Sequence, residues 1–333
     1  MIVANFYHLK NTNGLFYYGV DYLIDSQKNI RKVLVRSSLR TAVEQLFPAV
    51  EVVVCNPWRL ALEVVQAALQ DDFVYAPSSH PMPFLSKQMV VVHDVFPFLG
   101  RLGRLKRFLL RMSLFTSQCK VGYINKCDAQ PFIQSLGVTA SRQIFAPNKF
   151  PVAHRSIPEN RLDQMSRITV GLMGTDSIKK NYPTLFAATL ATNNNGSIDF
   201  LLYGHHTQYY HDLVHQFPDI NERLVESDHC SLDTFFSQID LIASVADHEG
   251  FGRPIAAALS AGVPCLLIER PVFREFFEGA AQFFPDVNTL IKKMVEIQTA
   301  GKVEAVTYTP PVSMVTAYRE TVVYLQAQSV VAG

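Results

Sequence analysis

The stretch EGFGRPIAAALSAGVP (Glu249–Pro264) constrains the fold of this chain more than any other feature. It follows the apolar run DLIAS (240–244), which predicts a buried strand that ends in small residues. Pro254 suits the first position of a helix, where its missing N–H costs nothing, and Gly262 predicts a left-handed end. A strand, a glycine turn and a helix N-terminus form an anion site, because backbone N–H groups and the helix dipole face one point. The carboxylate of Glu249 beside that point can accept hydrogen bonds from sugar hydroxyls, so the stretch suits a nucleotide-sugar diphosphate.

This stretch resembles the C-terminal donor-site signature of the retaining glycosyltransferases of the GT-B fold, family 4 (glycosyl transferases group 1). The signature runs Glu-Gly-Phe-Gly-x-Pro-x-x-Glu and is followed by Gly-x-Pro. The resemblance implies that Glu249 contacts the donor sugar and that the backbone after it faces the diphosphate, through Gly250, Phe251, Gly252 and Pro254. The second glutamate of the signature, which binds the ribose hydroxyls in the family, is Ala257 here. Alanine has no acceptor, so this position leaves open a changed or lost activity.

Two further segments match the family in the expected order. GTDSIKKN (Gly174–Asn181) resembles its Gly-x-x-x-x-Arg-Lys-Asn segment, which implies that Lys180 holds the donor diphosphate. Gly174 and Thr175 belong to the same donor loop, and Thr175 stands where an arginine often binds phosphate. HDVFPF (93–98) resembles the family's His-Asp segment, which implies that His93 lies beside the donor sugar and Asp94 on the acceptor or sugar side. A solvated lysine turn and a core or turn histidine are the alternatives for Lys180 and His93. For Asp94, the alternative is that it fixes the turn or the imidazole.

Weaker matches add three residues to the expected donor site. Gly14 lies in the first strand–helix loop, and Gly204 ends the strand segment YGHH, where it allows close backbone approach. Glu275 follows Gly-x-Pro, as a family glutamate often does; capping of a helix that begins near Phe273 is the alternative. The pair His211 and His215 has a helical spacing that could bind metal, but no third ligand is evident. We therefore expect no zinc site. We also expect no cofactor and no metal requirement, because a lysine and a helix dipole do the work that a cation would otherwise do.

The order of apolar runs predicts two halves in which strands and helices alternate, as in parallel sheets covered on both faces. With the resemblance, this predicts an α/β protein of the GT-B fold, with two Rossmann-like domains that face each other across a cleft. Residues 1–150 form the N-terminal acceptor-side domain, and residues 151–310 form the C-terminal nucleotide-sugar donor domain. A helix within 311–333 would cross back to the N-terminal domain. Prolines interrupt any regular pattern near the join, at 142–160.

Composition is that of an ordinary globular protein, with 48% hydrophobic and 18% charged residues among 333. Apolar runs without charge stay shorter than a membrane span, so a spanning helix is not expected. The first residues, MIVANFYHLK, lack the basic and apolar regions of a signal peptide. Five cysteines without paired spacing indicate reduced thiols. These features favour a cytoplasmic location.

Charge is unevenly distributed along the chain. Residues 1–150 hold 17 Lys and Arg against 9 Asp and Glu, whereas the remainder holds 13 against 20. Much of the excess lies in residues 100–120, which contain no acid. Apolar residues recur there at roughly helical spacing, at Leu102, Leu105, Leu109, Met112 and Phe115. This predicts a helix on the inner face of an anionic membrane, held by Arg104, Lys106, Arg107 and Arg111; a domain helix with a solvated basic face is the alternative.

The expected function is a retaining glycosyltransferase. It would move a sugar from a nucleotide-diphosphate donor to a hydroxyl on a glycan or lipid-linked acceptor of surface polysaccharide assembly, with His93, Lys180 and Glu249 as catalytic residues. The main alternative is a non-catalytic GT-B-like protein that binds a ligand or partner, which Ala257 and Thr175 favour. A GT-B epimerase or phosphorylase is the third reading. We expect no nucleic acid partner, and the sequence leaves the donor nucleotide, the sugar and the linkage open.

Overall fold

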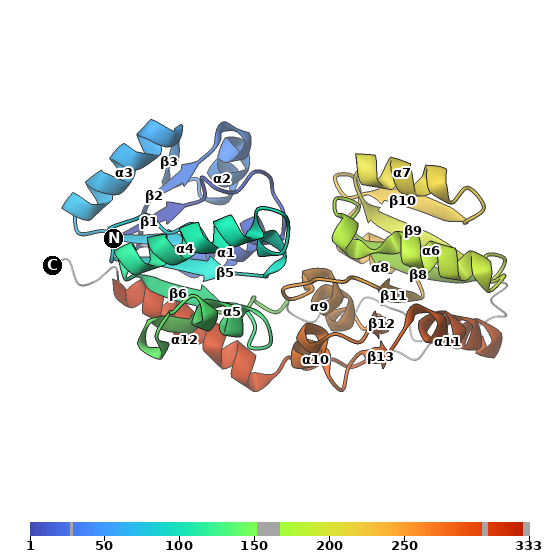
Figure 1. Cartoon of the computed structure of the whole chain (residues 1–333). Helices are drawn as coiled ribbons and strands as arrows, with labels where there is room; N and C mark the ends of the chain where they lie inside the picture. Colours follow the sequence, from blue (N-terminus) through green and yellow to red (C-terminus); the bar gives the residue numbers. More distant parts are fainter. Residues whose placement is uncertain (27–28, 152–166, 302–305, 329–333) are drawn as a thin grey trace. The chain divides into compact units, whose positions relative to one another are not determined.

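The computed structural model describes residues 1–26, 29–151, 167–301 and 306–328. In it the chain forms two compact units, each an α/β unit built on a parallel sheet (Figure 1). Unit 1 combines Met1–Lys149 with Pro311–Gly333, and unit 2 comprises Phe150–Pro310. The proline-rich join predicted at 142–160 lies partly outside the described residues.

Unit 1 has a seven-stranded sheet in the order β3-β2-β1-β4-β5-β6-β7. Its strands are β1 Ile2–Asn5, β2 Ile30–Val35, β3 Glu51–Val54, β4 Phe73–Ala76, β5 Gln88–Val92, β6 Lys120–Tyr123 and β7 Gln143–Phe145. Its helices are α1 Gly14–Ile24, α2 Arg40–Leu46, α3 Pro57–Leu69, α4 Gly103–Ser117, α5 Ala129–Ser135 and α12 Val312–Gln328. Helix α12 packs on this unit: the Tyr318 hydroxyl donates to the Asp21 carbonyl at 3.0 Å, and Thr321 Oγ1 donates to the Phe145 carbonyl at 3.1 Å.

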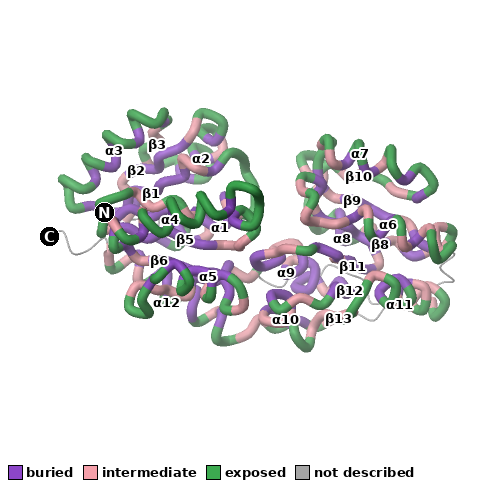
Figure 2. The backbone as a smooth tube through the Cα atoms, in the orientation of Figure 1, coloured by how far each residue is buried: buried purple, intermediate pink, exposed green. Residues whose placement is uncertain are grey.

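Helices α3 and α4 cover the same face of this sheet. Side chains two apart on a strand point to one face, and Val74 of β4 packs with the α3 cluster while Ala76 packs with the α4 cluster. Helix α3 begins where the Asn56 side chain accepts from the Arg59 N–H at 2.8 Å and Pro57 takes a first-turn position. The strands beneath are mostly buried, whereas long stretches of both helices are exposed (Figure 2).

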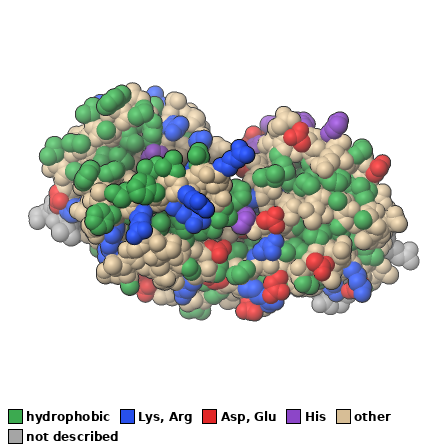
Figure 3. All heavy atoms as spheres, viewed as in Figure 1, with side chains coloured by type: hydrophobic (Ala, Val, Ile, Leu, Met, Phe, Trp, Pro, Cys, Tyr) green, Lys and Arg blue, Asp and Glu red, His purple; other side chains and the backbone are tan. Residues whose placement is uncertain are grey.

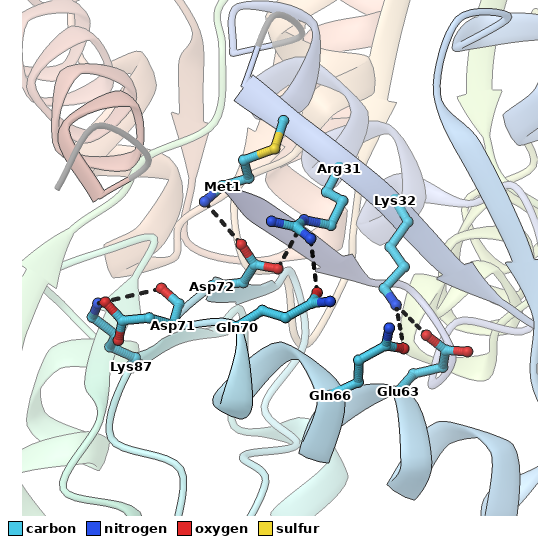
Figure 4. Close-up of polar contacts among 9 residues, drawn as sticks. All are labelled: Met1, Arg31, Lys32, Glu63, Gln66, Gln70, Asp71, Asp72 and Lys87. Atoms are coloured by element: carbon cyan, nitrogen blue, oxygen red, sulfur yellow. Dashed lines mark hydrogen bonds and ion pairs between the residues drawn. The ribbon is translucent and has the colours of Figure 1, made fainter. Parts of the chain in front are cut away.

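A polar cluster lies at the amino ends of the unit 1 strands (Figure 4). The Asp72 carboxylate is 2.9 Å from the terminal amine of Met1 and 3.0 Å from Arg31 Nε. The buried Lys32 ammonium pairs with the buried Glu63 carboxylate of α3. Because ligands of such sheets bind at the opposite, carboxyl edge, we assign this cluster to the stability of the fold.

Unit 2 has a six-stranded sheet in the order β10-β9-β8-β11-β12-β13. Its strands are β8 Ile168–Met173, β9 Ile198–Gly204, β10 Glu222–Glu226, β11 Leu241–Ser244, β12 Cys265–Ile268 and β13 Gln282–Phe284. Its helices are α6 Tyr182–Ala191, α7 Gln208–Gln216, α8 Leu232–Phe236, α9 Arg253–Ser260, α10 Pro271–Phe277 and α11 Val287–Ala300. In each sheet the strand order reverses at one point, between β1 and β4 in unit 1 and between β8 and β11 in unit 2. Ligands of open α/β sheets bind beyond the strand ends at such a reversal, because the loops on its two sides diverge.

Candidate active site

The reversal in unit 2 brings together the two segments that the sequence singles out. Lys180 lies in the loop that follows β8, and Glu249 lies in the loop that follows β11. Lys180 Nζ is 3.7 Å from Glu249 Oε2, and Lys179 Nζ is 3.9 Å from the same oxygen. The structure thus places both residues at one point on the carboxyl edge, and it adds Lys179, which the sequence analysis did not propose.

The loop after β8 folds the Lys180 side chain back over the strand end. Gly174 has φ +91°, a left-handed conformation that favours glycine. A Cβ at this position would lie 3.0 Å from Lys180 Cε, so the glycine also makes room for the lysine stem. The short 3-10 helix η5, Ile178–Lys180, ends at Asn181, whose φ of +55° turns the chain into α6. Both backbone turns therefore serve to hold Lys180 against the sheet edge.

The Glu249 carboxylate is largely withdrawn from solvent, with 14% of the side chain exposed. Its Oε2 atom is buried and has no hydrogen-bond partner among the described residues. The two lysine contacts are beyond hydrogen-bond distance. The lysines therefore compensate the negative charge of Glu249 but donate no hydrogen bond to Oε2. A buried acceptor left without a donor is costly, and a hydroxyl of a ligand would remove that cost.

Lys180 and Glu249 line a small cavity together with Gly252 and Pro254. The remaining lining residues are Met173, Tyr182, Ile242, Ala243, Ser244 and Ile255. Its volume of about 20 Å³ admits one hydroxyl-sized group. A larger hollow of about 660 Å³ lies elsewhere in unit 2, beside α11 and the end of α6, away from these side chains.

Helix α9 starts directly beyond the Glu249 loop. It begins at Arg253, so Pro254 occupies its second position rather than the first that the sequence predicts. Gly252 is the N-cap with φ +86°, and it has no side chain to cap the first turn. At the other end, Gly262 has the predicted left-handed φ, and the Val263 N–H donates to the Ala258 carbonyl at 2.9 Å, as in a Schellman motif.

Three other residues of the predicted donor site, Phe251, Ala257 and Glu275, lie in the core of unit 2 or within its helices. Phe251 is buried, and its ring lies 4.7 Å from that of Phe276, so this side chain anchors the loop in the core. Ala257 lies within α9 and is partly exposed. Helix α10 begins at Pro271, so Glu275 lies in its second turn and the predicted cap near Phe273 is wrong.

Thr175 and Gly204 meet each other rather than an open site. Thr175 is buried; its hydroxyl donates to the His205 carbonyl at 2.7 Å and accepts from the His205 N–H at 2.8 Å. Thr207 Oγ1 also donates to the Thr175 carbonyl. A Cβ on Gly204 would overlap Thr175 Oγ1 and lie 3.0 Å from Thr175 Cγ2. Thr175 therefore ties the loop after β8 to the loop after β9. Its only hydroxyl proton is donated to the His205 carbonyl, so this hydroxyl has no proton to donate to a phosphate.

The predicted residues of unit 1 lie at the carboxyl edge of its own sheet. His93 follows β5, and its Nε2 lies 2.8 Å from the Pro77 carbonyl, so the ring carries a proton on Nε2. Its ring meets that of Tyr18 edge-on, with centroids 4.4 Å apart. Asp94 Oδ1 accepts from the Phe96 N–H at 3.1 Å. Gly14 is the first residue of α1, where the Asn13 side chain caps the first turn through Leu15 and Phe16.

The basic segment at residues 100–120 contains α4. The apolar residues that α4 buries are not the ones that the sequence analysis singles out. Leu110 and Leu114 are the large apolar side chains of α4 that are buried. The five apolar residues that the sequence singles out, Leu102, Leu105, Leu109, Met112 and Phe115, are 44–69% exposed. Helix α4 is thus a helix of unit 1 with a solvated basic face, as the alternative has it, and its exposed surface also carries these five apolar side chains.

Within the described residues, His211 and His215 of α7 belong to no group of side chains that could hold a metal ion. Among the described residues, no group of three His, Cys, Asp or Glu side chains is placed to hold a metal ion. The His211 ring instead stacks on that of His206, with centroids 5.6 Å apart. Within the same described part of the chain, no helix is long and apolar enough to cross a bilayer.

No family model matches this chain, and no curated protein matches it in sequence. Solved structures match its fold. The glycosyltransferase WaaG, described as involved in lipopolysaccharide biosynthesis, matches with a TM-score of 0.64 and 14% identity over 99% of this chain and 97% of WaaG. A glycosyltransferase from Rickettsia africae ESF-5 matches with a TM-score of 0.65 and 12% identity over 98% of this chain and 95% of that one.

A variant of TarM from S. aureus, solved with fondaparinux, α-GlcNAc-glycerol and UDP, matches with a TM-score of 0.57 and 12% identity. The match covers 81% of this chain and 58% of the TarM chain, so this chain spans little more than half of TarM. Two parallel sheets of seven and six strands, with these neighbours, define the architecture. The chain has the GT-B fold of these glycosyltransferases.

Proposed function

We propose that unit 2 binds a nucleotide-diphosphate sugar at the reversal between β8 and β11, and that the chain transfers this sugar to a hydroxyl acceptor with retention of configuration. One observation carries the proposal: the buried Glu249 oxygen, without a hydrogen bond, beside the Lys180 ammonium at the start of α9. A hydroxyl donor and a diphosphate are the two partners that such a site lacks. Among nucleotides we favour UDP as the first to test, because the TarM variant was solved with UDP.

The proposed chemistry needs charge more than a nucleophile. The bond between the anomeric carbon and the phosphate oxygen breaks, and the acceptor oxygen bonds to that carbon on the same face. The acceptor proton passes to the leaving phosphate. Lys180 and Lys179 would stabilise the negative charge that develops on the diphosphate, and Glu249 would hold a sugar hydroxyl. His93 and Asp94 stay proposed residues of the sugar and acceptor side.

The two lysines also motivate the proposal that transfer needs no metal ion. Each ammonium lies within 4 Å of Glu249 Oε2, and their combined charge exceeds that of the one carboxylate between them. The exposed Asp176 carboxylate on the same loop offsets part of this excess. We expect nucleotide binding and transfer to persist in a chelating buffer.

We further propose that unit 1 docks on the inner, anionic face of the cytoplasmic membrane, where a glycan or lipid-linked acceptor of surface polysaccharide assembly would be available. Helix α4 exposes apolar side chains, and its Arg104, Lys106, Arg107 and Arg111 are exposed as well. Such a helix combines apolar insertion with attraction to anionic lipid.

Helix α3, on the same face of the sheet, extends this surface. Its Trp58, Leu62, Val65 and Leu69 recur at helical spacing and are 57–84% exposed, and Phe84, in the segment that joins β4 to β5, is 85% exposed. Phe84 has φ +62°, a strained conformation for a bulky residue. Apolar side chains gather over both helices in Figure 3. The two helices and Phe84 form a surface that a bilayer would cover.

A thermal-shift panel in chelating buffer tests the central proposal. UDP, GDP, dTDP, CDP and ADP, each with a sugar conjugate, are added to the full chain. One nucleotide at 100 times its Kd should stabilise the protein by about 2.7 kcal/mol. Lys180→Ala should lose the response, and Lys293→Ala, which removes a partly exposed lysine of α11, should keep it. Silence across the panel would favour the non-catalytic binder, with Ala257 as the reason.

Vesicle co-sedimentation tests the docking surface. The chain should bind vesicles that contain phosphatidylglycerol and release them when the four basic residues of α4 become glutamine. A control removes as many basic residues elsewhere, at Arg40, Lys87, Lys292 and Lys293. Equal binding by the two variants would contradict the assignment of this surface. Undiminished binding after Phe108→Ser and Phe115→Ser, which remove exposed aromatic side chains of α4, would contradict it too.

A further inference from the structure

Three basic side chains meet at the strand reversal of unit 1, in a place that the sequence analysis did not identify. Arg36 directly follows β2, His8 follows β1, and His80 follows β4. These strands are neighbours in the order β2-β1-β4, and the order reverses between β1 and β4. Their carboxyl ends share one edge, so the topology alone marks this point as a ligand site of unit 1.

The side chains at this point are held in a defined arrangement. The imidazole rings of His8 and His80 are stacked, with centroids 4.2 Å apart and planes within 7°. Arg36 Nε donates to the Tyr7 carbonyl at 2.8 Å, and its guanidinium carbon lies 4.8 Å from the centre of the Tyr7 ring. His80 Nδ1 lies 3.3 Å from the Ser78 hydroxyl. Arg36 and the imidazoles are thus oriented before any ligand arrives.

This cluster has basic groups without a neighbouring acidic group among the described residues. Within the described residues, none of the three side chains has a carboxylate at ion-pair distance. Burial, and then the neighbouring His80 and Arg36, lower the pKa of His8 to about 4, and burial lowers the pKa of His80. At neutral pH the two imidazoles are therefore neutral, which leaves the guanidinium as the charge of this cluster. An anion would neutralise Arg36 and favour protonation of both rings.

A metal ion suits this geometry poorly. The lone pair of an imidazole nitrogen lies in the ring plane, and two stacked parallel rings direct their lone pairs side by side rather than toward one point between the faces. Among the described residues there is also no third His, Cys, Asp or Glu ligand. An oxyanion, which accepts hydrogen bonds from guanidinium and imidazole N–H groups, fits the donor set.

We propose that His8, His80 and Arg36 bind a phosphate group carried by the acceptor, so that the acceptor is a phosphorylated glycan or lipid. The inference rests on the proposed function for the identity of the molecule that carries the phosphate. The anion site itself rests only on unit 1. Arg36 supplies the standing charge, and the two imidazoles supply N–H donors that gain protons as the phosphate binds.

The test uses imidazole NMR signals of the full chain during titration with inorganic sulfate, whose charge stays constant between pH 6 and 8, and then with inorganic phosphate. Signals of His8 and His80 should shift saturably, and sulfate should bind several-fold more tightly at pH 6 than at pH 8. Arg36→Gln should weaken binding by about tenfold or more, the loss of one charge-assisted hydrogen bond. His215→Gln removes an exposed imidazole of unit 2 and should change nothing at this site.

Two results would overturn the inference: absence of saturable shifts at His8 and His80, or equal sulfate affinity in wild type and Arg36→Gln. Lys180→Ala separates this site from the donor site, because it should abolish the nucleotide response and leave the sulfate shifts intact. A protein that binds a nucleotide but no sulfate at His8 would keep the proposed function and lose this inference. The converse result would keep the anion site and remove the transferase.

Discussion

The contact between Thr175 and Gly204 gives a quantitative prediction about how the donor loop is held. A methyl group added in Gly204→Ala would overlap Thr175 Oγ1 and lie 3.1 Å from Thr175 Cβ. Both residues are buried, so the overlap cannot be relieved by turning a side chain into solvent. Overpacking of this kind costs typically about 1–3 kcal/mol. The loop that carries Gly174 and Lys180 must move to accommodate the methyl group.

Thr175→Ala has its own cost, because it removes the hydroxyl that bonds both backbone groups of His205. We expect a loss of about 1–3 kcal/mol in the free energy of unfolding. In the double variant the hydroxyl is already absent and the worst overlap disappears. The double variant should therefore be more stable than the sum of the single losses predicts, by about 1 kcal/mol or more, as for residues in contact.

Calorimetric unfolding of the four proteins measures this coupling. For a domain of about 150 residues, each kcal/mol shifts Tm by about 2–4 °C. Gly204→Ala should also weaken nucleotide binding, and Thr175→Ala in the same chain should restore part of it. Strict additivity of the two losses would refute the claim that Thr175 limits the space at Gly204. Unchanged nucleotide affinity in Gly204→Ala would refute the claim that this contact positions the donor loop.

Three further predictions concern the fold and its pH dependence. Lys32→Met should destabilise the protein by about 3 kcal/mol, because it leaves the buried Glu63 carboxylate with only part of its counter-charge; urea unfolding that shows a smaller loss than Arg40→Met would contradict this. His8→Asn should flatten the pH dependence of stability: the pKa of His8 is lowered from 6.5 to about 4, so the unfolded state binds a proton that the folded state does not, and wild type loses stability as pH falls through that window. Urea unfolding at pH 7 and 5 checks this, and a wild-type advantage that does not shrink at pH 5 would count against it. Gly252→Ala should cost about 1–2 kcal/mol from its left-handed φ and additionally press on Phe277, 3.3 Å from the new methyl; calorimetry showing no loss would mean that the loop adjusts freely.

Elements that bury apolar residues could be predicted from the sequence. Runs such as QMVVV and ITVGLM mark β5 and β8, and the helix predicted within 311–333 is α12. Strands β7 and β10 lie at sheet edges, are only partly buried and carry no such run of apolar residues. In β10, Glu222, Arg223 and Glu226 interrupt any apolar run. The helices α2 and α5 have 7 residues each, which is too short for a long periodic pattern.

The site divides in a similar way. Glu249 and Lys180 could be predicted from short sequence motifs, because a glycine turn and the start of a helix are encoded by consecutive residues. The structural role of Thr175 could not be predicted from a local motif. Its hydrogen-bond partner His205 is 30 positions away and follows the neighbouring strand β9. His8 and His80 come together only through the strand order, which no local pattern specifies. Ser244 lines the cavity, and its signal was present in the small residues that end the run DLIAS.

The measurement that tests the central claim most directly is calorimetric titration of a nucleoside diphosphate and of its sugar conjugate into wild type, Glu249→Ala and Asp247→Ala. Asp247 is a nearby exposed carboxylate that pairs with Arg270, so it controls for the loss of a charge. The account predicts that Glu249→Ala weakens the sugar conjugate about tenfold relative to the diphosphate, because one hydrogen bond from a sugar hydroxyl to Glu249 is lost. Asp247→Ala should leave that ratio unchanged. A wild type that binds neither ligand, or a ratio that Glu249→Ala does not alter, would contradict the account.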